Sequence, residues 1–234
     1  MKLVIGGSTG FVATEVLTQA LKNPAITSIV ALGRREATMS TAAGSNAGKL
    51  KSVICKDFEN YPDSVKTELE NADACIWTIA VTPRKLSTVP WEATCKISRD
   101  YAVTAIKTLD TLRPAQEQPL RFLYVSGHFA PRSRAEIPPA LENHGLVDYG
   151  LLRGEVETLI LSYAEQSHGR VESCVVKPGL IDAPGAEKRD IPGVPHVDLP
   201  DIAAALVDQV IRGFEKDTLS NDDLVRIGGR VLAE

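Results

Sequence analysis

Short apolar runs and amphipathic stretches alternate along this chain. The apolar runs predict strands at about residues 3–5, 28–32, 51–55, 74–81, 120–125 and 171–177. Apolar positions at helical spacing predict helices at about residues 11–21, 62–70, 91–112, 149–166 and 201–214, and residues 224–227 predict a further strand. Strands that alternate with helices throughout predict an α/β fold with a doubly wound parallel sheet, in which ligands bind at the carboxyl ends of the strands.

The length of 234 residues predicts a single domain spanning 1–234 rather than two ordinary enzyme domains. Three stretches lack a helical or strand period. Residues 36–50 are rich in small and polar residues and predict a mobile surface loop. Residues 127–147 and 179–197 are rich in proline and glycine, and we expect them to cover a substrate, the latter as a small C-terminal segment.

Charge and cysteine content exclude several classes of partner. The net charge of −4 offers no basic footprint for nucleic acid or for an anionic membrane, and no apolar run is long enough to span a bilayer. Cys55, Cys75, Cys95 and Cys174 lack metal-ligand spacing, so we expect reduced thiols and no metal site. These features predict a cytoplasmic protein, monomeric or homodimeric, that acts on a small molecule.

The chain is organised around its first strand, turn and helix. Gly7, Gly10 and Ala13 have the spacing in which one glycine permits a turn, the next lets the backbone approach a pyrophosphate, and a small residue lets helix and strand pack closely. The helix N-terminus would then direct free N–H groups and a positive dipole end at the phosphates. The alternative is a glycine-rich turn that binds nothing.

The tip of the second predicted strand carries Arg34 and Arg35, and no carboxylate precedes Glu36. An acidic residue here would bind the ribose 2′-hydroxyl of NAD, whereas arginine accommodates the 2′-phosphate of NADP, so the sequence favours NADP(H). The alternative is two solvated loop arginines. Asp57 and Phe58, after the third strand, lie where an adenine ring would be flanked, although Asp57 also suits a plain loop or capping position.

Several motifs together resemble the short-chain dehydrogenase/reductases, and most of all their atypical, NmrA-like and epimerase-like group. They are Gly7-x-x-Gly10, Gly33-Arg34-Arg35, the strand ending at Ser126, Tyr149-x-x-x-Arg153 with Gly154-Glu155-Val156-Glu157, Lys177-Pro178-Gly179 and Asp201-Ile202-Ala203. The resemblance implies a Rossmann fold. It also implies a cofactor site made of Gly7, Ser8, Thr9, Gly10, Phe11, Val12, Arg34, Arg35, Asp57, Phe58, Ile79, Ala80, Arg153, Pro178 and Gly179.

The same resemblance implies that Tyr149 donates a proton to a substrate oxygen that Ser126 holds. Hydride transfer to a carbonyl builds negative charge on that oxygen, so both hydroxyls would lower the barrier. The family has a lysine four residues after the tyrosine, where this chain has Arg153, which lies on the same helix face but cannot relay a proton as lysine can.

Each of these residues also has a plainer interpretation. Tyr149 suits a half-buried helix tyrosine with a satisfied hydroxyl, and Ser126 suits a turn or helix cap. His128 is a candidate general acid or simple polar surface, and His144 and His196 lie in the predicted covering segments.

The sequence therefore predicts an NADPH-dependent oxidoreductase that reduces a small or medium apolar carbonyl compound. Tyr149 would be its acid, assisted by Ser126 and Arg153. Two alternatives keep the fold without net redox chemistry: an isomerase or cyclase, and a non-catalytic NADP(H)-binding regulator. The arginine at position 153 favours these alternatives.

Overall fold

A computed structural model describes residues 1–37, 48–113 and 118–234. Within these residues a seven-stranded sheet has the order β3-β2-β1-β4-β5-β6-β9, and every neighbouring pair of strands is parallel. Its strands are β1 (Lys2–Gly6), β2 (Ser28–Gly33), β3 (Leu50–Ile54), β4 (Ala74–Trp77), β5 (Leu120–Val125), β6 (Val171–Lys177) and β9 (Thr218–Ser220). This doubly wound order confirms the predicted Rossmann fold.

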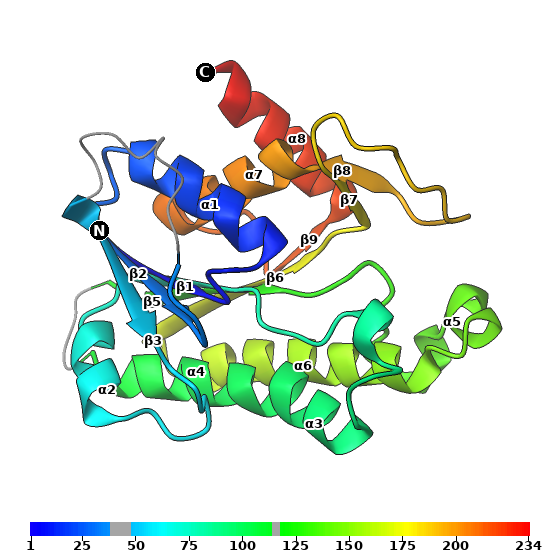
Figure 1. Cartoon of the computed structure of the whole chain (residues 1–234), viewed down its shortest axis with the longest axis horizontal. Helices are drawn as coiled ribbons and strands as arrows, with labels where there is room; N and C mark the ends of the chain where they lie inside the picture. Colours follow the sequence, from blue (N-terminus) through cyan, green and yellow to red (C-terminus); the bar gives the residue numbers. More distant parts are fainter. Residues whose placement is uncertain (38–47, 114–117) are drawn as a thin grey trace.

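Helices cover both faces of the sheet (Figure 1). One layer contains α1 (Phe11–Lys22), α7 (Leu199–Arg212) and α8 (Asn221–Ala233). The other contains α2 (Asp63–Leu69), α3 (Trp91–Cys95), the π-helical segment η3 (Lys96–Asp100), α4 (Tyr101–Thr111) and α6 (Val147–Gln166). The short helices η2 (Pro83–Lys85), η4 (Arg134–Glu136) and α5 (Pro139–Asn143) lie in connections between strands and helices.

Alternation along the strands divides the interior into two cores that share one sheet. In β1, Leu3 and Ile5 pack with α1, α7 and α8, whereas Val4 packs with residues of α2, α4 and α6. β1 and β4 are buried on both faces, which is why their sequences read as continuous apolar runs. The chain is thus a single α/β domain.

The strand predicted at residues 224–227 is wrong. Leu224 and Ile227 lie in α8, where they are three residues apart on the buried face of the helix, and the seventh strand is the preceding β9. A capping box begins α8: Ser220 Oγ accepts a bond from the Asp223 amide, and the Asp223 carboxylate accepts one from the Ser220 amide. A short apolar run cannot by its period be told apart from one turn of an amphipathic helix.

Other bounds and segments also differ from expectation. β4 ends at Trp77 rather than at residue 81, and α6 begins at Val147 rather than at Tyr149. The segment 127–147 contains η4 and α5, and the segment 179–197 contains β7 (Leu180–Asp182), which pairs in parallel with β8 (His196–Asp198). The loop predicted at 36–50 lies mostly outside the described residues, although Leu50 already belongs to β3.

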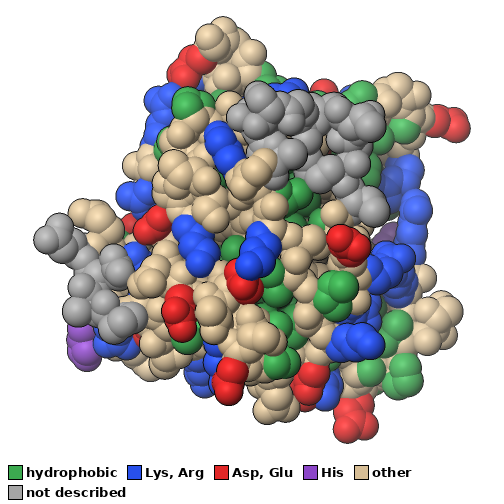
Figure 2. All heavy atoms as spheres, turned by 60° about the vertical axis from the view of Figure 1, so that its left-hand side comes forward, with side chains coloured by type: hydrophobic (Ala, Val, Ile, Leu, Met, Phe, Trp, Pro, Cys, Tyr) green, Lys and Arg blue, Asp and Glu red, His purple; other side chains and the backbone are tan. Residues whose placement is uncertain are grey.

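Among the described residues, no helix is long and apolar enough to cross a membrane. The four cysteines carry free thiols, and three of them, Cys55, Cys75 and Cys174, are buried. Burial raises the pKa of the Cys174 thiol to about 12. On the face shown in Figure 2, Lys and Arg side chains are interspersed with Asp and Glu side chains.

Candidate functional site

The turn between β1 and α1 has the backbone geometry that the glycine spacing predicts. Gly7 has a φ of +85°, and a side chain there would collide with Thr78. The amides of Gly7 and Ser8 donate to the Leu32 carbonyl at 2.9 and 3.2 Å, which fixes the turn against β2. Ala13 is fully buried against the sheet, as expected for the small third residue.

The N-terminus of α1 is open. Gly10 provides no side-chain cap, and the first turn carries no acidic residue. The first amides of a helix have no partner within it, so those of Phe11 and Val12 are available to an anion at the positive end of the helix dipole. This arrangement suits a phosphate group.

The tip of β2 lies beside this turn. Arg34 and Arg35 are exposed directly after Gly33, and the Ser8 side chain is buried against Gly33. Within the described part of the chain, Ser8 Oγ has no hydrogen-bond partner. A buried hydroxyl without a partner is costly, so the site has an unused donor where the resemblance places the adenosine ribose.

Two residues after β3, Asp57 and Phe58, contribute less to the candidate site than the sequence predicts. The exposed Asp57 carboxylate accepts bonds from the Glu59 amide and the Asn60 side chain, and these bonds lower its pKa. The Phe58 ring is buried in the core, 5.3 Å from the Tyr101 ring and 5.8 Å from the Trp77 ring. The expectation that the Phe58 side chain flanks a cofactor therefore needs correction, because its apolar ring is better stabilised in the interior.

The remaining residues assigned to the cofactor lie at the same edge of the sheet. Ile79 and Ala80 are half-buried after β4, and Pro178 and Gly179 follow β6. Thr78 fixes the end of β4 by donating its hydroxyl to the Gly6 carbonyl at 2.8 Å. Because β1, β4, β5 and β6 are parallel and adjacent, their carboxyl ends bring these residues together.

Tyr149 and Arg153 lie one turn apart on α6. The Tyr149 hydroxyl donates to the Val81 carbonyl at 2.6 Å. Burial raises the pKa of Tyr149, and the nearby positive charge of Arg153 offsets that effect only in part. In this structure the tyrosine is thus a neutral donor whose proton already has an acceptor.

Arg153 is buried and held on two sides. Its Nη2 donates to the Val125 carbonyl at 2.7 Å, and its guanidinium carbon lies 4.9 Å from the centre of the Tyr124 ring. Among the described residues, its buried Nη1 has no partner. Arg153 therefore has one unused donor at the carboxyl end of β5.

Ser126 lies in an ionic cluster that the sequence analysis missed. Its hydroxyl donates to Glu157 Oε1 at 2.5 Å, and Glu157 is fully buried. Lys177 Nζ donates to both oxygens of Glu157 at 3.0 Å, and Arg132 Nε donates to Oε2 at 2.9 Å. Donation from Ser126 to a substrate oxygen would require its bond to Glu157 to open or to pass on a proton.

A signal for this cluster was present in the sequence. Glu157 lies four residues after Arg153 and between the apolar residues Val156 and Ile160, where an acidic side chain is buried only if it is paired. Gly154 has a related role, since a side chain there would lie 1.8 Å from the Pro131 carbonyl oxygen. The loop after β5 therefore packs directly on α6 and brings Arg132 to Glu157.

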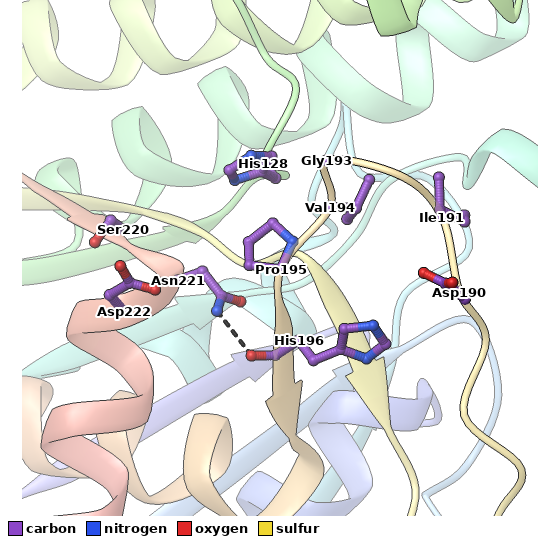
Figure 3. Close-up of a pocket in the computed structure, with 10 residues that line it drawn as sticks. All are labelled: His128, Asp190, Ile191, Gly193, Val194, Pro195, His196, Ser220, Asn221 and Asp222. Carbon is purple, nitrogen blue, oxygen red and sulfur yellow. Dashed lines mark hydrogen bonds between the residues drawn. The ribbon is translucent and has the colours of Figure 1, made fainter.

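A cavity of about 540 Å³ lies between the loop after β5, the covering segment and the start of α8 (Figure 3). It is lined by His128 from the loop after β5, by Ser220, Asn221 and Asp222 at the start of α8, and by Asp190, Ile191, Gly193, Val194, Pro195 and His196 of the covering segment. The buried Asn221 side chain joins the two ends of the covering segment, because it accepts from the Gly179 amide and donates to the His196 carbonyl.

Two histidines face this cavity. Burial and the neighbouring Lys177 lower the pKa of His128, so its imidazole is neutral near pH 7. His196 Nδ1 lies 2.8 Å from an oxygen of the buried Asp182 carboxylate. His144, in contrast, is exposed at the end of α5 and does not line the cavity.

No family model and no curated protein matches the sequence. Solved structures share the fold. The chain superposes on the oxidoreductase ylbE of Lactococcus lactis with a TM-score of 0.65 at 16% identity, covering 100% of this chain and 98% of that one. Serine dehydrogenase of Escherichia coli gives a TM-score of 0.69 at 15% identity, covering 94% and 96% of the two chains.

A third similar structure is DesIV, a dTDP-glucose 4,6-dehydratase of Streptomyces venezuelae solved with NAD and TYD bound. It gives a TM-score of 0.68 at 12% identity and covers 100% of this chain and 81% of the other. At these identities the comparisons show that this chain shares its fold with the three proteins.

Proposed function

We propose that this chain, with the fold of nicotinamide-dependent dehydrogenases and dehydratases, binds NADP(H) and reduces a small or medium apolar carbonyl compound. The proposal depends above all on one observation. The open N-terminus of α1 lies behind the Gly7–Gly10 turn, beside two arginines at the tip of β2. DesIV, which has the same fold, was solved with NAD bound.

The residues present fit such a cofactor. The α1 amides would bind the pyrophosphate, and Arg34 and Arg35 would pair with the 2′-phosphate, with Ser8 Oγ as a further donor. Nη1 of Arg153 is free to bind a ribose hydroxyl or the carboxamide. When bound, the dinucleotide supplies the hydride. The hydroxyls of Ser126 and Tyr149 are the proposed partners of the substrate oxygen, and Ile191, Val194 and Pro195 in the cavity suit an apolar substrate.

A specific observation favours a second candidate without net redox chemistry. The Tyr149 proton is bound by Val81, and Arg153 is stacked on Tyr124 rather than placed to relay a proton. An isomerase or cyclase, or a non-catalytic NADP(H)-binding regulator, would keep the cofactor and need no acid at position 149.

Two measurements test the proposal. Calorimetric titration with NADPH and NADH should show tighter binding of NADPH, and equal or tighter binding of NADH would contradict the assignment of the arginines. Incubation with NADPH and a panel of ketones and aldehydes should then consume NADPH in proportion to the alcohol formed. Tight binding with no consumption would favour the non-redox candidate.

A further inference from the structure

The buried carboxylate of Glu157 accepts hydrogen bonds from three side chains, those of Ser126, Arg132 and Lys177. Arg132 and Lys177 hold the loop after β5, because Lys177 Nζ also donates to the Ala130 carbonyl at 2.7 Å and Arg132 bonds Thr218. The bond from Ser126 adds nothing to this anchoring, since Ser126 directly follows β5 and its amide donates to the Val176 carbonyl of β6. The hydrogen bond from the Ser126 hydroxyl to Glu157 therefore needs an explanation other than anchoring of this loop.

Two of these three groups share one acceptor atom of Glu157. Ser126 Oγ and Lys177 Nζ both donate to Oε1 of Glu157, at 2.5 and 3.0 Å, while Arg132 donates to the other oxygen, Oε2. Oε1 is therefore the atom through which a proton can pass between the lysine and the serine. The lysine side chain is 22% exposed, whereas that of Glu157 is fully buried, so the lysine is nearer to solvent than the carboxylate is.

The arginine at position 153 creates a need for such a path. A guanidinium stays protonated at any ordinary pH and cannot give up a proton and regain it, whereas a lysine ammonium can. Tyr149, whose pKa is raised by burial, donates its proton to a backbone carbonyl. Neither Arg153 nor Tyr149 therefore provides a path for a proton between a substrate oxygen and solvent.

We propose that Ser126, Glu157 and Lys177 form a proton relay between the substrate oxygen and solvent. The proposal rests on the proposed function, because it concerns the proton that carbonyl reduction consumes. Ser126 is the catalytic residue that touches the substrate oxygen. Glu157 and Lys177 act through Ser126 as positioning residues that supply its proton.

In the direction of reduction, the bound dinucleotide would supply the hydride that adds to the carbonyl carbon, and the C=O electron pair would move to oxygen. That oxygen takes the Ser126 hydroxyl proton, while Lys177 gives a proton to Oε1 of Glu157, which passes it to Ser126 Oγ. Lys177 is left as a neutral amine and takes a proton from water. The net change is one hydride and one proton added to the carbonyl.

The decisive variant is Lys177→Arg. Arginine keeps the positive charge and can still bond both Glu157 and Ala130, but it does not release a proton. A structural role would be preserved by this change, whereas the relay would be broken. We expect a roughly 10²-fold loss of turnover with NADPH, the lower end of what proton transfer contributes, while NADPH affinity measured by quenching of tryptophan emission stays within about two-fold.

Lys216→Arg is the matched control. Lys216 Nζ also bonds both oxygens of one carboxylate, that of Asp223 at 2.8 and 3.0 Å, far from Ser126 in the sequence and in an exposed setting. Its replacement should leave turnover unchanged. Full turnover by Lys177→Arg would overturn the relay.

Glu157→Gln and Ser126→Ala test the other two members. Each should lose turnover to a similar extent, and the double variant should lose little more than either one, because residues that act as a unit are not additive. Losses that multiply in the double variant would contradict a single path. Tyr149→Phe serves as comparison: if it alone abolished turnover while Glu157→Gln kept it, the proton would come from the tyrosine.

A measurement without substrate separates this inference from the proposed function. A proton in a short bond between a hydroxyl and a carboxylate should resonate downfield of the amide protons in the NMR spectrum. We expect it in the wild type and in Lys177→Arg, and not in Ser126→Ala or Glu157→Gln. Its absence from the wild type would overturn the relay. A wild type that reduces no carbonyl compound would instead overturn the proposed function, and the resonance would still decide the Ser126–Glu157 bond.

Discussion

The buried guanidinium of Arg153 shows how a single residue can change the chemistry available to a site. Its bond to Val125 and its contact with Tyr124 fix it as a cation that orients its surroundings. The proton-conducting amine, under the relay proposal, is Lys177 on β6. Under this proposal Lys177 therefore takes over the proton transfer that the resembled family assigns to a lysine at position 153.

Arg153→Lys should raise turnover in the Lys177→Arg background, because it returns an amine that can lose a proton to the α6 face. In the otherwise unchanged protein the same substitution should preserve turnover, since Lys177 already supplies the path. Steady-state rates with NADPH and one carbonyl substrate measure both effects. A large loss of turnover on Arg153→Lys in the otherwise unchanged protein would indicate that the guanidinium itself binds substrate or cofactor through two hydrogen bonds.

Arg34→Ala combined with Arg35→Ala should erase the preference for NADP(H). Each charge-assisted bond to the 2′-phosphate is worth roughly 1.5–3 kcal/mol, so NADPH affinity should fall at least ten-fold while NADH affinity changes little. Calorimetry with both dinucleotides gives the ratio. Glu36→Ala, the adjacent exposed position, is the control and should not weaken NADPH binding.

At the scale of elements, α6 and the loop after β5 fit together only because Gly154 has no side chain. Gly154→Ala places a methyl group against the Pro131 carbonyl, and overpacking of this kind destabilises by roughly 1–3 kcal/mol. Gly229→Ala on α8 has open space and should stabilise by roughly 0.5–1 kcal/mol. Urea unfolding of the two variants should therefore give shifts of opposite sign.

The capping box of α8 predicts a dependence of stability on acid. Burial alone would raise the pKa of Asp223, but bonds from Lys216 and Ser220 hold it well below its usual value. A carboxyl with a depressed folded-state pKa stabilises fully above its unfolded pKa of about 3.9 and loses this contribution as pH falls toward the folded value. Asp223→Asn should lower stability at pH 7 by about 1 kcal/mol.

The same substitution should flatten the fall of stability below about pH 5, because the titrating group is gone. Thermal unfolding at several pH values between 7 and 3 measures both changes. An unchanged slope in the variant would show that other carboxylates carry the acid sensitivity.

The sequence predicts the helices and strands of this fold well where the hydrophobic periodicity extends over many residues. The helix over 149–166 and the strands over 120–125 and 171–177 agree with α6, β5 and β6 to within two residues, because each buries a continuous apolar face. The predicted strand at 224–227 fails because four residues cannot reveal a helical period. The sequence does not reveal that the Phe58 ring is buried, because the exposure of this ring depends on its packing against Trp77 and Tyr101, which are distant in sequence.

For the candidate site, the sequence predicts where the residues lie better than it predicts their hydrogen-bond partners. It places Ser126, Tyr149 and Arg153 at the carboxyl edge of the sheet, since those positions follow strands or begin a helix. It does not reveal that Glu157, 31 residues after Ser126, accepts a hydrogen bond from the serine hydroxyl. Such a pairing depends on how closely α6 approaches β5 and β6, which a one-dimensional pattern does not contain.

At the scale of the whole molecule, a dinucleotide that binds the folded chain alone must stabilise it. At free NADPH 100 times its Kd the gain is about 2.7 kcal/mol, which for a domain of this size raises Tm by roughly 5–10 °C. The same concentration of NADH should raise Tm less. Differential scanning fluorimetry at fixed protein concentration measures both shifts, and no shift with either dinucleotide would contradict cofactor binding.

The contacts of β9 and the first turn of α8 have a consequence for biosynthesis. Asn221 joins Gly179 to His196, and Thr218 bonds Arg132, so the cavity and the ionic cluster both use residues that follow all other parts of the site in the chain. A ribosome makes the turn around Gly7 well before these residues. Chains stalled before residue 217 would already contain that turn, whereas the cavity wall would close only after the first turn of α8 had left the ribosome.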